Sequence, residues 1–258
     1  MAILVMLLPF SLSLSLKIAV SIRPLELMVK EIVDGMCEVN VMVPEGSNPH
    51  TYSLTLKDRK TIEEADVVFI LGEGLDGWLR STAPDKVYVL SKDFKREFSE
   101  NVHIWLDPVA VLWMASKIRD IVAKLDPANA EAYHKNFCRF ACTLCEKWES
   151  VSWRPDKPIL ELHPALYHLI KRLGGKLLWI TSGHGESPSL GRLRKLIAEC
   201  KKSGVNTLMV EKDMSYRIAA PFIEALNPRI VEVDVLGWSV ESYTDLLMSI
   251  VHTLETSE

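Results

Sequence analysis

The sequence predicts an α/β fold: two βα lobes with mainly parallel sheets, joined by a long rigid backbone helix. First, short apolar runs of β type alternate with helical stretches, which is the pattern of βα units. Second, one segment of about 24 residues, from 127 to 150, interrupts this alternation with many polar residues and no glycine. Third, a chain of 258 residues has room for two modest α/β domains or one large one. We therefore expect an apolar leader (1–16), an N-terminal lobe (17–125), a connecting helix (126–150) and a C-terminal lobe (151–258).

In the first lobe, four apolar runs of strand length are separated by turn and helix signals. Pro24 begins a helix that Gly35 ends, because proline suits the first helical turn and glycine suits the position after the last one. Asp107 and Pro108 begin a later helix as cap and first helical residue. The expected strands are 17–22, 38–43, 66–71 and 86–90, with a helix at 55–64 and a loop at 44–49.

The connecting helix and the second lobe follow. Asp126 and Pro127 repeat the helix-start signal, and a helix of about 24 residues would be about 36 Å long at 1.5 Å per residue. After residue 155 the alternation resumes, with strands expected at 158–162, 176–180, 207–210 and 230–234 and helices between them. A last helix buries Tyr243, Leu246, Leu247, Ile250, Val251 and Leu254 at helical spacing.

Residues 2–16 are apolar and carry no charge. At about 15 residues this run is shorter than the roughly 20 that a membrane-spanning helix needs. It is similar to the apolar region of a secretory signal, although no basic residue precedes it. A hydrophobic first strand or a buried helix is the alternative, and we favour export. No cysteine follows the run, so a lipid-anchored terminus is not supported.

Charge and cysteines narrow the function only slightly. A net charge of −4 with scattered Lys and Arg gives no reason to expect nucleic acid as a partner. Cys138, Cys142 and Cys145 share one face at helical spacing, and Cys142 and Cys145 form a lone CxxC without a second pair. We expect these cysteines to be small buried hydrophobic residues. The compartment therefore cannot be read from them.

Four distant segments each offer one metal-ligand side chain beside an apolar run: His50, His103, His163 and Asp234. Three imidazoles and one carboxylate suit Zn²⁺, and four protein donors fill its tetrahedron. A filled shell leaves no place for an activated water, which favours metal binding over hydrolysis. Because ligands bind beyond the carboxyl ends of strands and between domains, we expect the four to meet in the interlobe cleft.

Each candidate also has a simpler interpretation. Asp234 at a strand end commonly caps the following turn, and its alternatives as ligand are Glu211 and Glu186. His184 is expected near the cleft, as an outer group or simply exposed. Asp107 is expected to be a helix cap that could also orient His103. No role is assigned to His134, His168 and His252, which fall on predicted helices.

Several linked motifs, in one order and over nearly the whole chain after the leader, resemble the metal-binding solute receptors of zinc and manganese ABC importers. They are VSIRPLELMVKEIVDG, VPEGSNPHTYSLTLKD, EEADVVFILGEGLDGWL, HIWLDP, LDPANAEAYHKNF, LELHPALYHLIKRLGG, GESPSLGRLRKLI and IVEVDVLG. The resemblance implies two lobes bridged by a long helix, with no enzymatic activity. It also implies metal ligands at His50, His103, His163 and Asp234.

The resemblance further implies Zn²⁺ rather than Mn²⁺ as the transported ligand, since manganese receptors usually have Glu in place of the third His. Imidazole-rich sites suit zinc, and oxygen-rich sites suit manganese. The expected partner is an ABC-type metal permease, served by a monomer that is exported to the periplasm or the outer cell surface. The chain departs from many zinc receptors in lacking a His- and acid-rich loop, and in having Asn101 and Val102 before His103.

Two other functions remain open from sequence. A zinc hydrolase would use three His ligands with Asp234 or Glu211 as general base, but the chain has neither HExxH nor GxSxG. A surface adhesin with a structural metal could use the same receptor fold.

Overall fold

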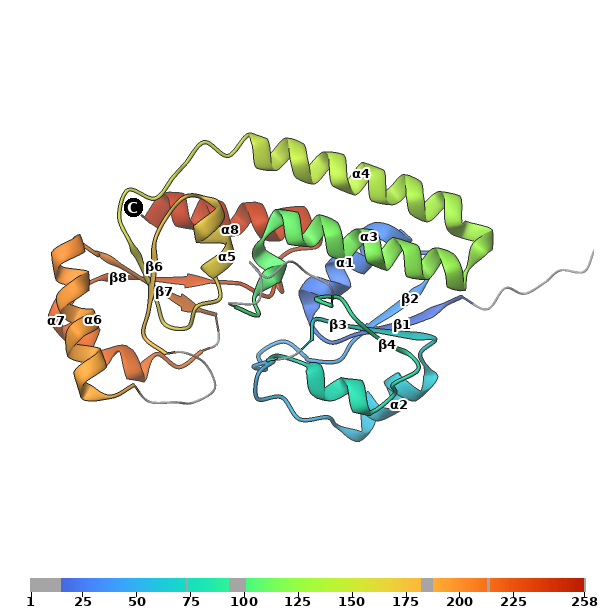
Figure 1. Ribbon diagram of the computed structural model, residues 1–258, viewed down its shortest axis with the longest axis horizontal. Coiled ribbons are helices and arrows are strands. Elements are labelled where there is room, and N and C mark those ends of the chain that lie inside the picture. The colour runs from blue at the N-terminus through green and yellow to red at the C-terminus, as the bar shows by residue number, and fades with distance from the viewer. Residues whose placement is uncertain (1–14, 73, 93–100, 182–187, 213, 258) are drawn as a thin grey trace, which may run out of the picture.

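The computed structural model describes residues 15–72, 74–92, 101–181, 188–212 and 214–257. They form two α/β lobes, each built on a four-stranded parallel sheet (Figure 1). Strand order is β2-β1-β3-β4 in the first sheet and β6-β5-β7-β8 in the second, so the two lobes have the same topology. This confirms the predicted fold class. Residues 1–14 of the expected leader lie outside the described ranges. No helix within those ranges has both the length and the apolar character to cross a bilayer.

The first lobe contains β1 (Lys17–Val20), β2 (Glu38–Val41), β3 (Val67–Ile70) and β4 (Val87–Val89). Its helices are α1 (Arg23–Val33), α2 (Leu56–Glu64) and α3 (Pro108–Leu125). Local sequence explains where they begin. Thr55 and Asp58 form a capping box before α2, and Asp107 accepts hydrogen bonds from the first backbone N–H groups of α3.

The connecting helix α4 (Ala130–Glu149) runs antiparallel to α3 along the outer edge of the molecule (Figure 1). Its 20 residues give a length of about 30 Å, shorter than the expected 36 Å. The difference arises at the start, because Pro127–Asn129 form a separate 3₁₀ turn. A chain leaving α3 must reverse direction there, and a 3₁₀ turn is a common connector of this kind.

The second lobe contains β5 (Ile159–Glu161), β6 (Leu177–Trp179), β7 (Thr207–Glu211) and β8 (Arg229–Val233). Its helices are α5 (Tyr167–Arg172), α6 (Leu190–Ser203), α7 (Ala220–Leu226) and α8 (Tyr243–Ser257). β5 and β7 are the central pair, so their carboxyl ends lie next to each other. That adjacency positions one side of the site described below.

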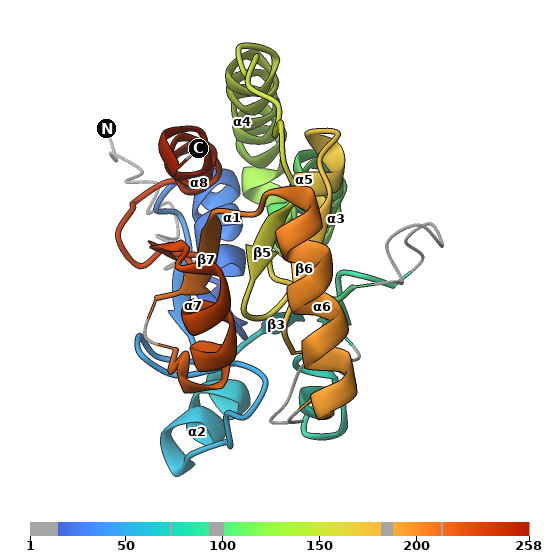
Figure 2. The ribbon, with the colours of Figure 1, turned by 90° about the vertical axis from the view of Figure 1, so that its left-hand side faces the viewer.

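One hydrophobic core continues across the lobe boundary. It joins Ile18 and Leu25 of the first lobe to Leu169, Met209 and Leu247 of the second. The last helix, α8, packs against both α1 and α4, and Figure 2 shows it beside them. An apolar interface of this kind opposes wide opening of the cleft.

The expectation that the clustered cysteines are buried is wrong. Cys138, Cys142 and Cys145 are exposed free thiols, whereas Cys200 is buried and Cys37 is half-buried. Helical spacing correctly placed the three on one face of α4. That face points to solvent, because the opposite one carries the buried residues Tyr133, Asn136, Phe140 and Leu144.

Candidate metal centre

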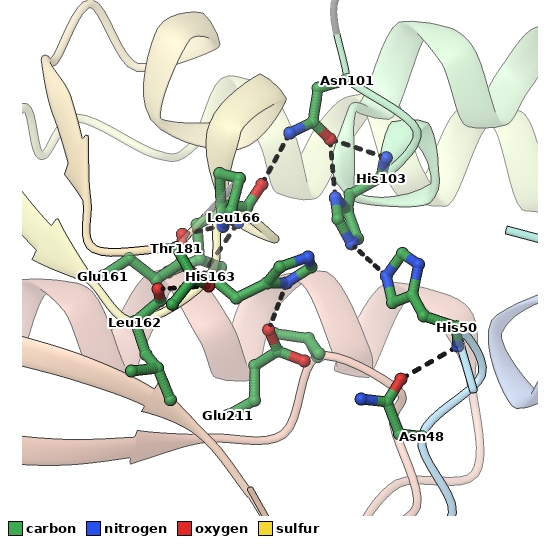
Figure 3. A network of polar contacts seen from close by, with 12 residues as sticks. Asn48, His50, Asn101, His103, Glu161, Leu162, His163, Leu166, Thr181 and Glu211 are labelled. Carbon is green, nitrogen blue, oxygen red and sulfur yellow. Dashed lines mark hydrogen bonds and ion pairs between the residues drawn. The ribbon is translucent and has the colours of Figure 1, made fainter. Parts of the chain in front are cut away.

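Three imidazoles from distant segments meet between the lobes (Figure 3). The Nε2 atoms of His50 and His103 are 3.1 Å apart. The ring centroid of His163 lies 5.0 Å from that of His50 and 4.6 Å from that of His103. Each ring contributes one nitrogen to a group whose atoms all lie within 4.8 Å of one another. The structure therefore brings together three of the four predicted ligands.

His50 reaches the cluster from the loop between β2 and α2. The Asn48 side-chain oxygen accepts a hydrogen bond from the His50 backbone N–H at 2.9 Å, which fixes the turn. His50 is half-buried, whereas His103 and His163 are buried. His50 is thus the most exposed of the three imidazoles.

His103 is oriented by Asn101, a residue to which sequence reasoning assigned no role. The Asn101 side-chain oxygen lies 2.8 Å from the His103 backbone N and 2.7 Å from its Nδ1. Because an amide oxygen only accepts, Nδ1 carries the proton and Nε2 keeps its lone pair for the cluster. Asn101 also donates from its amide to the Pro164 carbonyl of the other lobe at 2.9 Å. The only sequence signal was the departure from the family pattern at this position.

His163 follows β5, and Glu211 ends the neighbouring strand β7. His163 Nδ1 lies 2.8 Å from a Glu211 carboxylate oxygen. The carboxylate accepts the Nδ1 proton, which again directs Nε2 toward the other two rings. Sequence reasoning named Glu211 as an alternative ligand, and the structure instead shows it bonded to a ligand candidate.

One edge of the cluster matches the edge of a tetrahedral zinc shell. At Zn–N bonds of about 2.0–2.1 Å, two nitrogens of a tetrahedron lie about 3.3–3.4 Å apart. The 3.1 Å separation of the His50 and His103 nitrogens is within a few tenths of an ångström of this edge. Two of the three rings have the oxygen acceptor at Nδ1 that metal-ligating histidines almost always have.

Asp234 lies just after β8, and its carboxylate is not part of the close group. It accepts hydrogen bonds from Gly237 N, Ser239 N and Ser239 Oγ, each at 2.8 Å, and so caps the turn. Burial acts to raise the pKa of Asp234, but these bonds together outweigh it and lower the pKa. Asp234 and Glu211 both line a cleft of about 390 Å³. The structure thus shows the capping role directly, beside the cluster.

Glu161, at the end of β5, is fully buried. Its two carboxyl oxygens accept from the Leu166 backbone N–H at 3.2 and 3.1 Å. Burial, followed by the nearby negative charge of Glu211, raises its pKa well above the usual range. Glu161 therefore anchors the turn that carries His163.

Other hydrogen bonds and an ion pair connect the two lobes. Trp105 donates from its ring N–H to the Val235 carbonyl at 2.9 Å, and His168 Nε2 contacts the Asn101 carbonyl at 2.9 Å. Arg172 of α5 binds one Asp107 oxygen through two nitrogens, at 3.0 and 2.7 Å. Asp107 therefore caps α3 and also forms an ion pair with Arg172 of the other lobe. His168 has a structural role that sequence reasoning did not assign.

The remaining histidine and acidic candidates fall elsewhere. His134 and His252 are exposed on α4 and α8. Glu186 and His184 lie outside the described residues.

Comparison with known proteins finds matches that extend over most of the chain. A family model described as "Zinc-uptake complex component A periplasmic" (ZnuA) matches residues 18–257. A Thermotoga maritima protein is 26% identical over 228 residues, covering 85% of this chain and 84% of that protein. The high-affinity zinc uptake system protein ZnuA of Bacillus subtilis is 23% identical over 278 residues, covering 94% and 87%.

Solved structures share the fold. A crystal structure of ZnuA superimposes with a TM-score of 0.82 at 21% identity, covering 94% of this chain and 99% of that one. The Pseudomonas aeruginosa binding protein FpvC in complex with Mn²⁺ has a TM-score of 0.79 at 23% identity, covering 95% and 100%.

Proposed function

The chain belongs to the ZnuA family of periplasmic zinc-uptake components, and from that premise we propose that it captures Zn²⁺ between its lobes through His50, His103 and His163. Members of this family are metal-binding receptors of ABC importers rather than enzymes, which sets the hydrolase alternative aside. The single observation that carries the proposal is the convergence of three imidazole nitrogens within 4.8 Å. Two imidazoles have an oxygen acceptor on the far nitrogen, as metal ligands do.

Zinc is the proposed cargo in preference to manganese. Three neutral imidazoles suit a borderline ion, whereas Mn²⁺ prefers carboxylate and carbonyl oxygens. At one nitrogen-rich site the general affinity order also places zinc above manganese. Among solved structures with this fold, one contains Mn²⁺ and another contains zinc, so the ligand set must decide.

Asp234 is the proposed fourth donor, and Glu211 is the proposed orienting partner of His163. The lowered pKa of Asp234 keeps its carboxylate ionised at neutral pH. Its carboxylate accepts hydrogen bonds from Gly237 and Ser239, and an ionised carboxylate has about four lone-pair sites, so it can also bind an ion. Because Asp234 lies outside the close group in the structure, the turn that it caps would have to bring the carboxylate nearer to the three imidazoles to complete the shell.

The protein acts outside the cytoplasm, as its family does, and its partner is an ABC permease that accepts the ion. We assign it to the periplasm or the outer surface and expect it to work as a monomer. Interlobe bonds such as Trp105 to Val235 and Arg172 to Asp107 would hold the lobes together during release. Release would then require a local rearrangement of the ligand loops.

Zinc uptake by cells tests the delivery role. Cells in which the gene for this chain is deleted should accumulate radioactive zinc poorly from zinc-limited medium, and the wild-type chain should restore uptake. The variant His163→Ala, exported to the same level, should not restore it. Equal rescue by both forms would refute the proposal.

A further inference from the structure

The exposed cysteine stripe of α4 is a feature that the interlobe site does not explain. Cysteine is among the residue types most often buried, so a group of exposed free thiols needs an explanation other than core packing. Here three of them, Cys138, Cys142 and Cys145, are exposed on one helix. Figures 1 and 2 show α4 at the edge of the molecule, with α1, α3 and α8 all on one side of it.

Helix geometry sets the three thiols side by side. At about 100° per residue, they occupy an arc of about 60° on the helix surface. Cys138 and Cys142 are four residues apart, and Cys142 and Cys145 are three apart, so each pair has Cβ atoms about 5–6 Å from each other. Cys142 therefore has a thiol neighbour on both sides. Cys138 and Cys145 are about 10.5 Å apart along the axis.

The spacing suits a two-thiolate metal site. Two sulfurs on one ion lie at most about 4.6 Å apart if each metal–sulfur bond is about 2.3 Å, the value for zinc. Cβ atoms 5–6 Å apart reach this separation by rotation of the side chains, which exposed residues undergo within nanoseconds.

We propose that this cysteine stripe binds one soft monovalent ion, Cu(I), through Cys142 and either Cys138 or Cys145. Thiolates select soft ions such as Cu(I), whereas the imidazoles of the interlobe cluster suit zinc. Because the two ligand sets differ and lie on different elements, the stripe is independent of the proposed zinc function. It is a second metal site of different selectivity on the same chain.

The test is an anaerobic Cu(I) titration of the full, metal-stripped and reduced chain against a chromophoric Cu(I) chelator. To remove the imidazole cluster as a competing site, the titration is done in a His50→Ala/His163→Ala background. The expected result is one Cu(I) per chain, with an ultraviolet thiolate-to-copper band. A chain in which Cys138, Cys142 and Cys145 are all changed to Ser should lose both.

Single variants provide the sharpest control. Cys142→Ser leaves only the distant pair and should lose the Cu(I), whereas Cys138→Ser and Cys145→Ser each leave one close pair and should retain it. Cys37→Ser, away from the stripe, should also retain it. All three stripe positions are exposed, so thermal unfolding should be nearly unchanged. Binding that survives the triple substitution, or equal loss in all three single variants, would overturn the proposal.

Discussion

Glu211 provides the most discriminating prediction, because the structure shows it bonded to the ligand candidate His163 and does not place it as a ligand of the ion itself. The variant Glu211→Gln keeps the size of the side chain and an acceptor oxygen, but removes the negative charge that faces His163 Nδ1 at 2.8 Å. Loss of such an orienting partner typically weakens metal affinity about 10- to 100-fold, which is about 1.4–2.7 kcal/mol. Loss of a direct ligand should cost more. Dividing the roughly 10–16 kcal/mol of a structural zinc site among four ligands gives about 2.5–4 kcal/mol each.

The assay is competition for Zn²⁺ between the protein and a chromophoric chelator at fixed pH and salt. Wild type, Glu211→Gln and His163→Ala are compared, with Glu224→Gln as a control at an exposed carboxylate on α7. We expect Glu211→Gln to lie between wild type and His163→Ala. An affinity equal to wild type would refute the orienting role. An affinity as low as that of His163→Ala would show that Glu211 is itself a ligand.

Three further outcomes follow from the same structure. Zinc affinity should fall as the pH is lowered, because protons compete with the ion for the imidazole nitrogens. The chelator assay repeated across pH measures this, and a flat profile would contradict histidine ligation. Burial raises the pKa of Asp76, so the folded state binds that proton more tightly than the unfolded state does. Its stabilising effect is present below the ordinary value of about 3.9 and is lost as pH rises through the raised pKa. The thermal unfolding temperature of wild type should therefore fall relative to that of Asp76→Asn as the pH rises. A difference between the two that stays constant with pH would count against this. Asp107→Ala should lower the free energy of unfolding, measured by urea denaturation, by about 2–3 kcal/mol. The substitution removes the α3 cap and leaves Arg172 without its carboxylate partner. A loss below about 0.5 kcal/mol would argue that neither contact stabilises the fold.

Local sequence signals were enough to predict the lobes and most element positions. Apolar runs with turn residues on each side located the strands, most clearly the central strands β1, β3, β5 and β7, which are buried on both faces. The start of α4 was predicted too early, since Asp126 and Pro127 begin a 3₁₀ turn before the helix. A helix-start signal does not distinguish the two kinds of turn.

The three histidines could be predicted because each follows or precedes a recognisable element and because the linked motifs resemble a known family. The contacts that orient them could not. Glu211 meets His163 only because β5 and β7 are neighbours in the sheet, 48 residues apart in the chain. Asn101 depends on a local turn that sequence does not reveal. The cysteines show a related limit, since periodicity defines a helix face without saying whether that face is covered.

Native mass spectrometry of the metal-stripped chain, titrated with Zn²⁺ and Mn²⁺, tests the central claim most directly. Wild type should form a tight adduct with one Zn²⁺ and a weaker one with Mn²⁺, and His163→Ala should lose the zinc adduct. A zinc adduct that is unchanged in His163→Ala, or absent in wild type, would contradict capture of the ion by the three imidazoles.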